Sequence, residues 1–210
     1  MHIGVIGAGK LGATLAEWCS QSGHEVAVTS RHPERLTGLV DRMGGHGAAM
    51  PVADAVAYAD AVLFAPAWST AREAIDLAAD GLDGKVVIDA TNPPSAAPGG
   101  RSGLETLMGW APSAHWVKAF NTLPANVLSR RRGHDPLLAE FVCTSHPDAR
   151  ATASQLIRDL GFAPFYAGGA EAARLTETGG PLQLNEIDVA DATMFLAQAL
   201  ALPSPSPAGA

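Results

Sequence analysis

The chain has 210 residues, of which 47% are hydrophobic and 17% charged, and its formal net charge is −7 at pH 7. This size and composition predict a soluble globular α/β protein with one large domain, alone or with a small appendage. The negative charge argues against nucleic acid as a general partner. No apolar run reaches the ~18 residues that a membrane helix needs, so we expect no membrane partner and a cytoplasmic location.

Cysteine and histidine give no sign of a metal site. Cys19 and Cys143 are too few for a disulfide framework, which indicates a reducing compartment, and we expect both to be buried thiols. The histidines are scattered without the spacing of metal ligands, so we predict no metal ion. These scattered residues are His24, His32, His46, His115, His134 and His146.

The first predicted element is a short apolar strand over residues 2–6. It runs into Gly7-x-Gly9-x-x-Gly12, and the segment from Ala13 to Cys19 continues with helical character. In this context the first glycine allows a tight turn, the second lets the backbone approach a pyrophosphate, and the third lets the helix lie close to the strand. The start of the helix then offers free amide groups to phosphates, so the pattern predicts a dinucleotide site.

The second strand, residues 25–29, ends in Ser30-Arg31. An NAD enzyme carries an acidic residue there, which binds the ribose 2′-hydroxyl and would repel a 2′-phosphate. A hydroxyl and a guanidinium instead bind phosphate oxygens, and Arg35 follows four residues after Arg31. The pattern favours NADP(H) over NAD(H); the alternative is that both arginines belong to a solvated helix start.

The rest of the chain alternates between helices and strands, which is typical of a Rossmann-like, doubly wound and mainly parallel sheet. We expect helices over residues 50–59, 69–79, 123–131 and 147–160, and strands over 61–65, 85–89, 115–119, 140–143 and 163–166. The domain is predicted to span residues 1–202. A helical extension covers about 180–202, with a long helix over 182–202, and residues 203–210 form a disordered tail.

Ligands of such sheets lie beyond the carboxyl ends of the strands. Three of these ends carry distinctive segments: Ala65-Pro66-Ala67-Trp68, Asp89-Ala90-Thr91-Asn92-Pro93-Pro94 and Val117-Lys118-Ala119-Phe120-Asn121-Thr122. The segment over residues 92–103 is rich in Pro, Gly, Ala and Ser, as expected of a surface loop beside a cleft.

Taken together, these motifs resemble the family of deazaflavin-dependent NADP reductases. The resemblance covers residues 1 to about 200 in order and spacing, and that family is related to the reductase domain of the membrane ferric reductases. It implies that Gly9, Ser30, Arg31 and Arg35 hold the phosphates of NADP. It also implies that Pro66, Asn92 and residues 119–121 line the nicotinamide end, where a second flat cofactor stacks.

The predicted cofactor-binding residues are Gly7, Ala8, Gly9, Lys10, Leu11, Gly12, Ser30, Arg31, Arg35, Ala65, Pro66, Trp68, Asn92, Ala119, Phe120 and Asn121. Trp68 could instead be a core aromatic residue, Asn92 could start a turn, and Asn121 could cap a helix. The chain departs from archaeal members at Ala8, where a hydroxyl residue is common, in a longer segment over 65–69, and at Gly179-Gly180-Pro181.

The resemblance implies direct hydride transfer between NADP(H) and a deazaflavin coenzyme of the F420 type, or a related flavin-like acceptor. No catalytic side chain is expected, because the cofactors carry the chemistry. Two other functions stay open: an NADPH-dependent reductase of a small organic substrate, a flavin or ferric iron, and a non-catalytic NADPH-binding regulator.

Two surface features complete the predictions. The run Arg130-Arg131-Arg132 is typical of a solvated helix end, but it could attract the acidic tail of a deazaflavin. The terminal helix is rich in apolar residues, so it either folds back onto the sheet or forms a homodimer surface.

Overall fold

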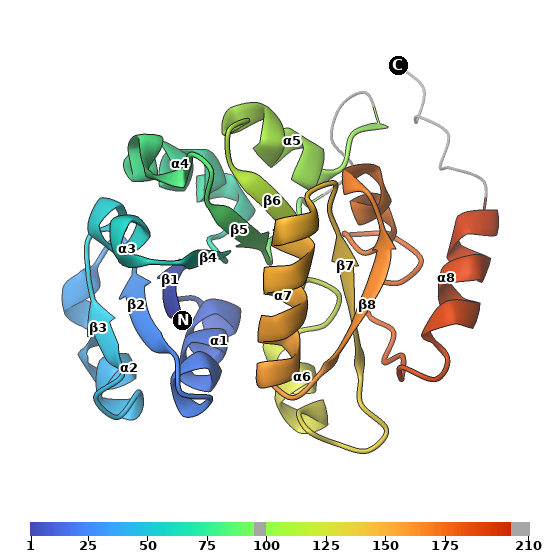
Figure 1. Ribbon diagram of the computed structural model, residues 1–210, viewed down its shortest axis with the longest axis horizontal. Coiled ribbons are helices and arrows are strands. Elements are labelled where there is room, and N and C mark those ends of the chain that lie inside the picture. Colours follow the sequence, from blue (N-terminus) through green and yellow to red (C-terminus); the bar gives the residue numbers. More distant parts are fainter. Residues whose placement is uncertain (95–99, 203–210) are drawn as a thin grey trace.

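The computed structural model describes residues 1–94 and 100–202, which contain an eight-stranded sheet (Figure 1). The strand order is β3-β2-β1-β4-β5-β6-β7-β8. The strands are β1 (His2–Ile6), β2 (Glu25–Thr29), β3 (Gly47–Ala49), β4 (Ala61–Phe64), β5 (Val86–Asp89), β6 (His115–Lys118), β7 (Ala139–Cys143) and β8 (Ala163–Gly168). The first six strands are parallel in the order of a dinucleotide-binding sheet, so the predicted Rossmann-like fold is confirmed.

Helices cover both faces of this sheet. They are α1 (Lys10–Gln21), α2 (Thr37–Arg42), α3 (Val52–Tyr58), α4 (Ala71–Ala78), α5 (Gly103–Trp110), α6 (Ala125–Arg131), α7 (Pro147–Asp159) and α8 (Ala192–Ala201), with 3₁₀ turns η1 (Pro33–Leu36), η2 (Trp68–Thr70), η3 (Ala79–Leu82) and η5 (Ala170–Leu175). One apolar cluster lies under α1, α2, α6 and α7, and a second lies under α3, α4, α5, η5 and α8. The sheet is therefore the middle of three layers. Helices cover its faces, so the ends of the strands are the part that reaches the ligand-binding surface.

β7 reverses the direction of the sheet. It pairs with β6 in antiparallel fashion, through Lys118 and Cys143, whereas β8 pairs with β7 in parallel fashion across α7. The residues that follow β7, from Thr144 on, therefore run alongside β6 toward its amino end, away from the dinucleotide site. The prediction of a mainly parallel sheet holds, but the sequence did not show where the reversal lies.

Three short elements escaped prediction. β3 is a Gly-Ala-Ala segment without the branched residues that mark strands, and α2 follows directly on η1. α5 carries a capping box, in which the Ser102 hydroxyl accepts the Glu105 amide and the Glu105 carboxylate accepts the Ser102 amide. The Ser-x-x-Glu spacing of that box is a sequence signal that could have identified this helix.

The predicted helix over 182–202 is wrong in its first half. Only Ala192–Ala201 is helical, and Asp188 forms an isolated bridge with Leu138 beside the sheet. Leu182 and Ile187 are buried in the second apolar cluster, so their spacing reflects contact with the sheet and not a helical face. The expected disordered tail over 203–210 lies outside the described residues, as does part of the predicted loop over 92–103.

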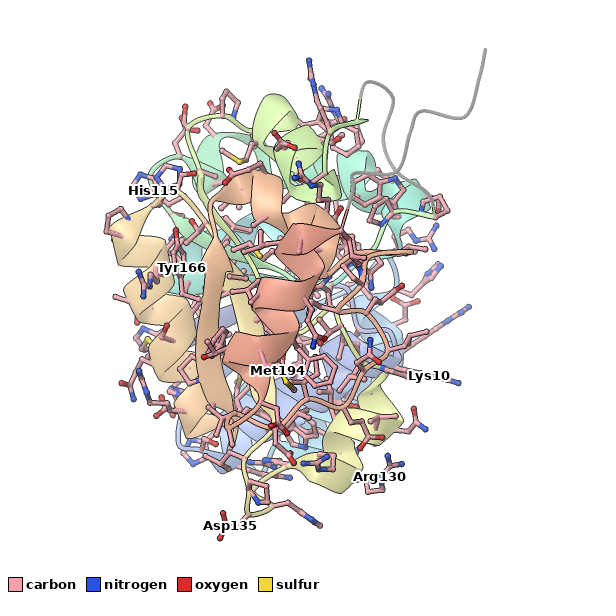
Figure 2. The ribbon with its side chains drawn as sticks, turned by 90° about the vertical axis from the view of Figure 1, so that its right-hand side faces the viewer. Lys10, His115, Arg130, Asp135, Tyr166 and Met194 are labelled. Carbon is pink, nitrogen blue, oxygen red and sulfur yellow. The ribbon has the colours of Figure 1, made fainter. Side chains whose placement is uncertain are left out.

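α8 lies beyond β8 at the right of Figure 1 and faces the viewer in Figure 2. Ala192 and Ala199 are buried against the second cluster, while Met194 and Leu200 are 50% and 60% exposed. The helix therefore folds back on one side and leaves an apolar side open. None of the helices within residues 1–94 and 100–202 is long and apolar enough to cross a bilayer.

Candidate dinucleotide-binding site

The turn after β1 depends on two glycines. Gly7 has φ +96°, and a Cβ there would lie 2.6 Å from the Pro66 nitrogen at the end of β4. A Cβ on Gly12 would lie 1.9 Å from the Gly7 carbonyl oxygen. These contacts show why the strand-to-helix turn accepts only glycine at both positions.

Gly9, in contrast, faces open space. A Cβ added there would meet no atom within 4 Å in the described structure, and Gly9 is the N-cap residue of α1. No side chain caps this helix start, and its first turn contains no acidic residue. The first amides of α1 are therefore directed at a space that an anion can enter without steric conflict.

The end of β2 places the predicted phosphate ligands beside this turn. The Ser30 hydroxyl accepts the His32 amide at 3.0 Å, which shapes the turn, and the side chains of Arg31 and Arg35 are exposed. Arg35 lies in η1, where its Nε is 4.0 Å from a Glu34 carboxylate oxygen that is also 3.3 Å from His32 Nδ1. Cationic and neutral donors thus gather at one strand end in a chain that is acidic overall.

A cavity of about 340 Å³ joins these two features. Its volume is within the range of small-molecule sites, and its walls come from the ends of β1, β2 and β4 and from residues of α3, η2 and α4. The lining residues are Ile6, Gly7, Ala8, Gly9, Thr29, Ser30, Arg31, His32, Val52, Ala65, Pro66, Ala67, Thr70, Glu73, Ala74 and Leu77. The Thr29 hydroxyl in this wall is buried and has no hydrogen-bond partner among the described residues.

Seven of the predicted cofactor-binding residues line the cavity: Gly7, Ala8, Gly9, Ser30, Arg31, Ala65 and Pro66. Sequence reasoning missed the wall contributed by α3, η2 and α4, including Val52, Thr70 and Glu73. The order of the elements could have indicated this wall. The segment that follows β4 begins where β4 ends, so η2 and the start of α4 lie near the strand ends that bind the ligand.

The other predicted residues lie outside this cavity in the described structure. Trp68 is half-buried at the margin of the second apolar cluster and packs against Trp110, with ring centroids 5.9 Å apart. Ala119 and Phe120 are fully buried, and Phe120 has φ +61°. Lys10, Leu11 and Gly12 lie in the first turn of α1, and Arg35 lies in η1.

Asn92 and Asn121 connect the ends of β5 and β6. The Asn92 amide donates to the Asn121 carbonyl oxygen at 2.7 Å, and the Asn121 amide donates to Asn92 Oδ1 at 3.1 Å and to the Thr176 carbonyl oxygen at 2.9 Å. Asn121 Oδ1 is buried and has no partner among the described residues. The pair therefore holds together the segments that contain Asn92, Asn121 and Thr176.

A buried ion network lies directly beneath these loops. Lys118 Nζ lies 2.6 Å from Asp89 Oδ2, 2.9 Å from Glu177 Oε1 and 2.8 Å from the Thr91 carbonyl oxygen, and Lys118 and Asp89 are fully buried. Burial acts to lower the pKa of Lys118, but the two carboxylates outweigh it and raise that pKa, so the ammonium stays charged. Glu177 also accepts the Gly103 and Leu104 amides at the start of α5. The network therefore fixes the ends of β5 and β6 relative to α5.

Glu140, on β7 behind the end of β6, is a further buried acid. Its Oε2 accepts the Phe120 amide at 3.2 Å, and its Oε1 has no partner among the described residues. Burial raises the pKa of Glu140 to about 8, so the folded protein holds this carboxyl in its neutral form at pH 7.

Glu140→Gln is expected to make stability less dependent on pH. In the wild type the folded pKa of about 8 exceeds the ordinary value of 4.5. The folded state then binds the proton that the unfolded chain has lost, and the free energy of unfolding falls by roughly 3–5 kcal/mol between pH 4.5 and 8. Urea unfolding of both proteins from pH 5 to 9, with exposed Glu171→Gln as control, measures this. Parallel pH curves for wild type and Glu140→Gln would show that Glu140 is not the titrating group.

Two other predictions concern reactive and charged side chains. Cys19 and Cys143 are free and buried, as expected, and burial raises the pKa of both thiols to about 12. Arg130 and Arg131 pair with Glu186, and Arg131 also pairs with Asp188. Arg132 instead donates to the Leu160 carbonyl oxygen and to Gln21 Oε1, and the attraction of an anionic tail by this run stays a prediction.

The comparisons with known proteins agree with this geometry. A family model described as "NADP oxidoreductase coenzyme F420-dependent" matches residues 2–93, which contain the glycine turn and the ends of β2 and β4. The F420-dependent NADP reductase of Methanothermobacter thermautotrophicus is 29% identical over 210 residues, covering 88% of each chain. The chain is therefore related to the F420-dependent NADP oxidoreductases, and the family model matches the part that holds the glycine turn.

Two further similarities extend the family relationship. The metalloreductase STEAP3 of Rattus norvegicus is 29% identical over 179 residues, covering 83% of this chain but 35% of the rat protein. The chain thus spans about a third of that relative's length. The crystal structure of the hypothetical protein SMa0349 from Sinorhizobium meliloti is 31% identical, with a TM-score of 0.81, and the match covers 90% of this chain and 95% of that one. The predicted family resemblance is therefore confirmed.

Proposed function

We propose that the protein transfers hydride directly between NADP(H) and a deazaflavin coenzyme of the F420 type. The observation that carries this proposal is the cavity that joins the open Gly9 turn to the Ser30-Arg31 end of β2. Amides of the α1 start would bind the pyrophosphate, and Ser30, Arg31 and Arg35 would bind the 2′-phosphate. NADP(H) supplies the hydride chemistry, so the protein contributes binding, orientation and exclusion of water.

The residues at the ends of β5 and β6 would form the nicotinamide end of this site. Asn92, Asn121 and the backbone of residues 119–121 are held in place by hydrogen bonds and by the buried Lys118 network. Pre-organised groups of this kind favour hydride transfer because the two rings must approach within about 3–3.5 Å in a fixed orientation. Asn121 Oδ1, which has no partner among the described residues, would give this end of the site an acceptor for a carboxamide N–H.

Two other functions make different predictions for the same site. A reductase of ferric iron, a flavin or a small organic substrate would use the same NADPH half with a different acceptor surface. A non-catalytic regulator would bind NADPH but give no access to its nicotinamide. The name of the archaeal relative supports the deazaflavin, whereas the name of the rat relative supports a metal acceptor.

Stopped-flow mixing distinguishes these functions. Protein loaded with NADPH is mixed in turn with an oxidised deazaflavin, a flavin, an Fe(III) chelate and an imine, and the loss of nicotinamide absorbance is followed, with protein-free mixtures as the background. We expect the fastest loss with the deazaflavin. Faster loss with another acceptor would reassign the substrate, and no loss with any acceptor would indicate a regulator.

A further inference from the structure

Two histidines and an aspartate that are dispersed in the sequence come together in the fold. Ligand atoms of His115, His146 and Asp148 all lie within 4.8 Å of one another. His115 is the first residue of β6, and the other two residues lie at the junction between β7 and α7. They meet because β7 is antiparallel to β6, so the residues that follow β7 run alongside β6 toward its first residue.

The side chains already adopt a convergent arrangement. The imidazole rings of His115 and His146 are stacked, with centroids 4.6 Å apart and planes inclined by 11°. His115 Nδ1 lies 2.5 Å from Asp148 Oδ2. Two imidazoles and one carboxylate are a ligand set that suits Zn²⁺, Co²⁺ and Ni²⁺. Bonds of about 2.0–2.2 Å place the ligand atoms of a tetrahedral zinc site roughly 3.4 Å apart, so modest side-chain rotations complete the site.

The backbone beneath these side chains is fixed. The Thr144 hydroxyl donates to the Trp116 carbonyl oxygen at 2.7 Å and accepts the His146 amide at 3.0 Å, which joins β6 to the residues that follow β7. The His115 amide donates to the Lys85 carbonyl oxygen at 2.9 Å. Because both backbone positions are held, a metal ion would have to order only three partly exposed side chains.

We infer that His115, His146 and Asp148 form a binding site for one divalent transition-metal ion, with water completing its coordination. The expectation of no metal site rested on spacing along the sequence, and the reversal of β7 overturns that reasoning. In Figure 2 His115 and Lys10 lie on opposite sides of the molecule, so the metal site is separate from the phosphate-binding turn. A bound ion would connect β6 to α7 and stabilise the folded protein without taking part in hydride transfer.

Calorimetric titration of tag-free, chelator-treated protein with ZnCl₂ tests this inference. We expect one ion per chain with a dissociation constant in the micromolar range, and a rise in Tm with zinc concentration. His115→Ala and His146→Ala should each weaken binding at least tenfold. His46→Ala is the matched control, because His46 Nδ1 also lies 2.8 Å from a carboxylate, that of Glu25, but pairs with no second imidazole in the described structure.

Cobalt provides an independent measurement. Co²⁺ bound by two imidazoles and a carboxylate gives visible absorption bands that depend on coordination geometry, and we expect these bands to disappear in His146→Ala while NADPH affinity is unchanged. The inference is overturned if zinc binding is absent, or if either histidine variant binds zinc as the wild type does. It is also overturned if His46→Ala weakens binding as strongly as His115→Ala.

Discussion

Lys118→Met is expected to lower the free energy of unfolding by about 3–5 kcal/mol, because it leaves Asp89 and Glu177 as buried carboxylates without their cation. Methionine fills a similar volume, so the loss is electrostatic and not a cavity effect. Removing the exposed Arg72–Asp76 pair with Arg72→Met should cost less than about 1 kcal/mol. Urea unfolding of both variants gives the comparison.

A second substitution separates charge from packing at Lys118. In the Lys118→Met background, Glu177→Gln removes one of the two uncompensated charges and keeps the shape of the side chain, so it should recover part of the lost stability. If Glu177→Gln lowered stability equally in both backgrounds, the network would not act as an ion pair. An effect of Lys118→Met as small as that of Arg72→Met would lead to the same conclusion.

Gly12→Ala is expected to abolish NADPH binding and to lower stability by about 1–3 kcal/mol. The added Cβ would lie 1.9 Å from the Gly7 carbonyl oxygen, so the turn that presents the α1 amides would have to open. Gly109→Ala in α5 is the control, because its Cβ would meet nothing within 4 Å. That control should leave binding unchanged and stability equal or slightly higher.

Gly9→Ala separates binding from folding at the same turn. Its Cβ would meet nothing within 4 Å of the described protein, so stability should change by less than about 1 kcal/mol. The methyl group would, however, occupy the space expected for the pyrophosphate, and NADPH affinity should fall. Thermal unfolding and calorimetry measure the two effects. Unchanged NADPH affinity would show that the phosphates do not approach Gly9.

The sequence predicted the elements whose signals are local. β1 and β2 were placed correctly because each is an apolar run followed by distinctive turn residues. β3 lacks such a signal, since Gly47–Ala49 gains its strand conformation from pairing with β2. The segment before α8 was wrongly predicted as helical. Leu182 and Ile187 are buried in the second apolar cluster although the chain there is irregular, and their apolar spacing in the sequence resembles that of a helix.

The candidate site was predictable to the same extent. Residues at strand ends were found because parallel strands place their carboxyl ends together, whereas the α4 wall and the Lys118–Asp89–Glu177 network depend on contacts between distant segments. Asp89 and Lys118 did carry a signal, since charged residues at the ends of buried strands require partners. The cluster of His115, His146 and Asp148 carried no sequence signal, because these residues meet only through the antiparallel direction of β7.

Selectivity for the phosphorylated nucleotide is tested most directly by calorimetric titration of wild type and Arg31→Ala with NADPH and NADH. We predict that the wild type binds NADPH more tightly, that Arg31→Ala weakens NADPH binding roughly 10- to 100-fold and leaves NADH binding unchanged, and that exposed Arg72→Ala changes neither. Equal affinity of the wild type for NADPH and NADH, or a preference that survives in Arg31→Ala, would contradict the role assigned to the end of β2.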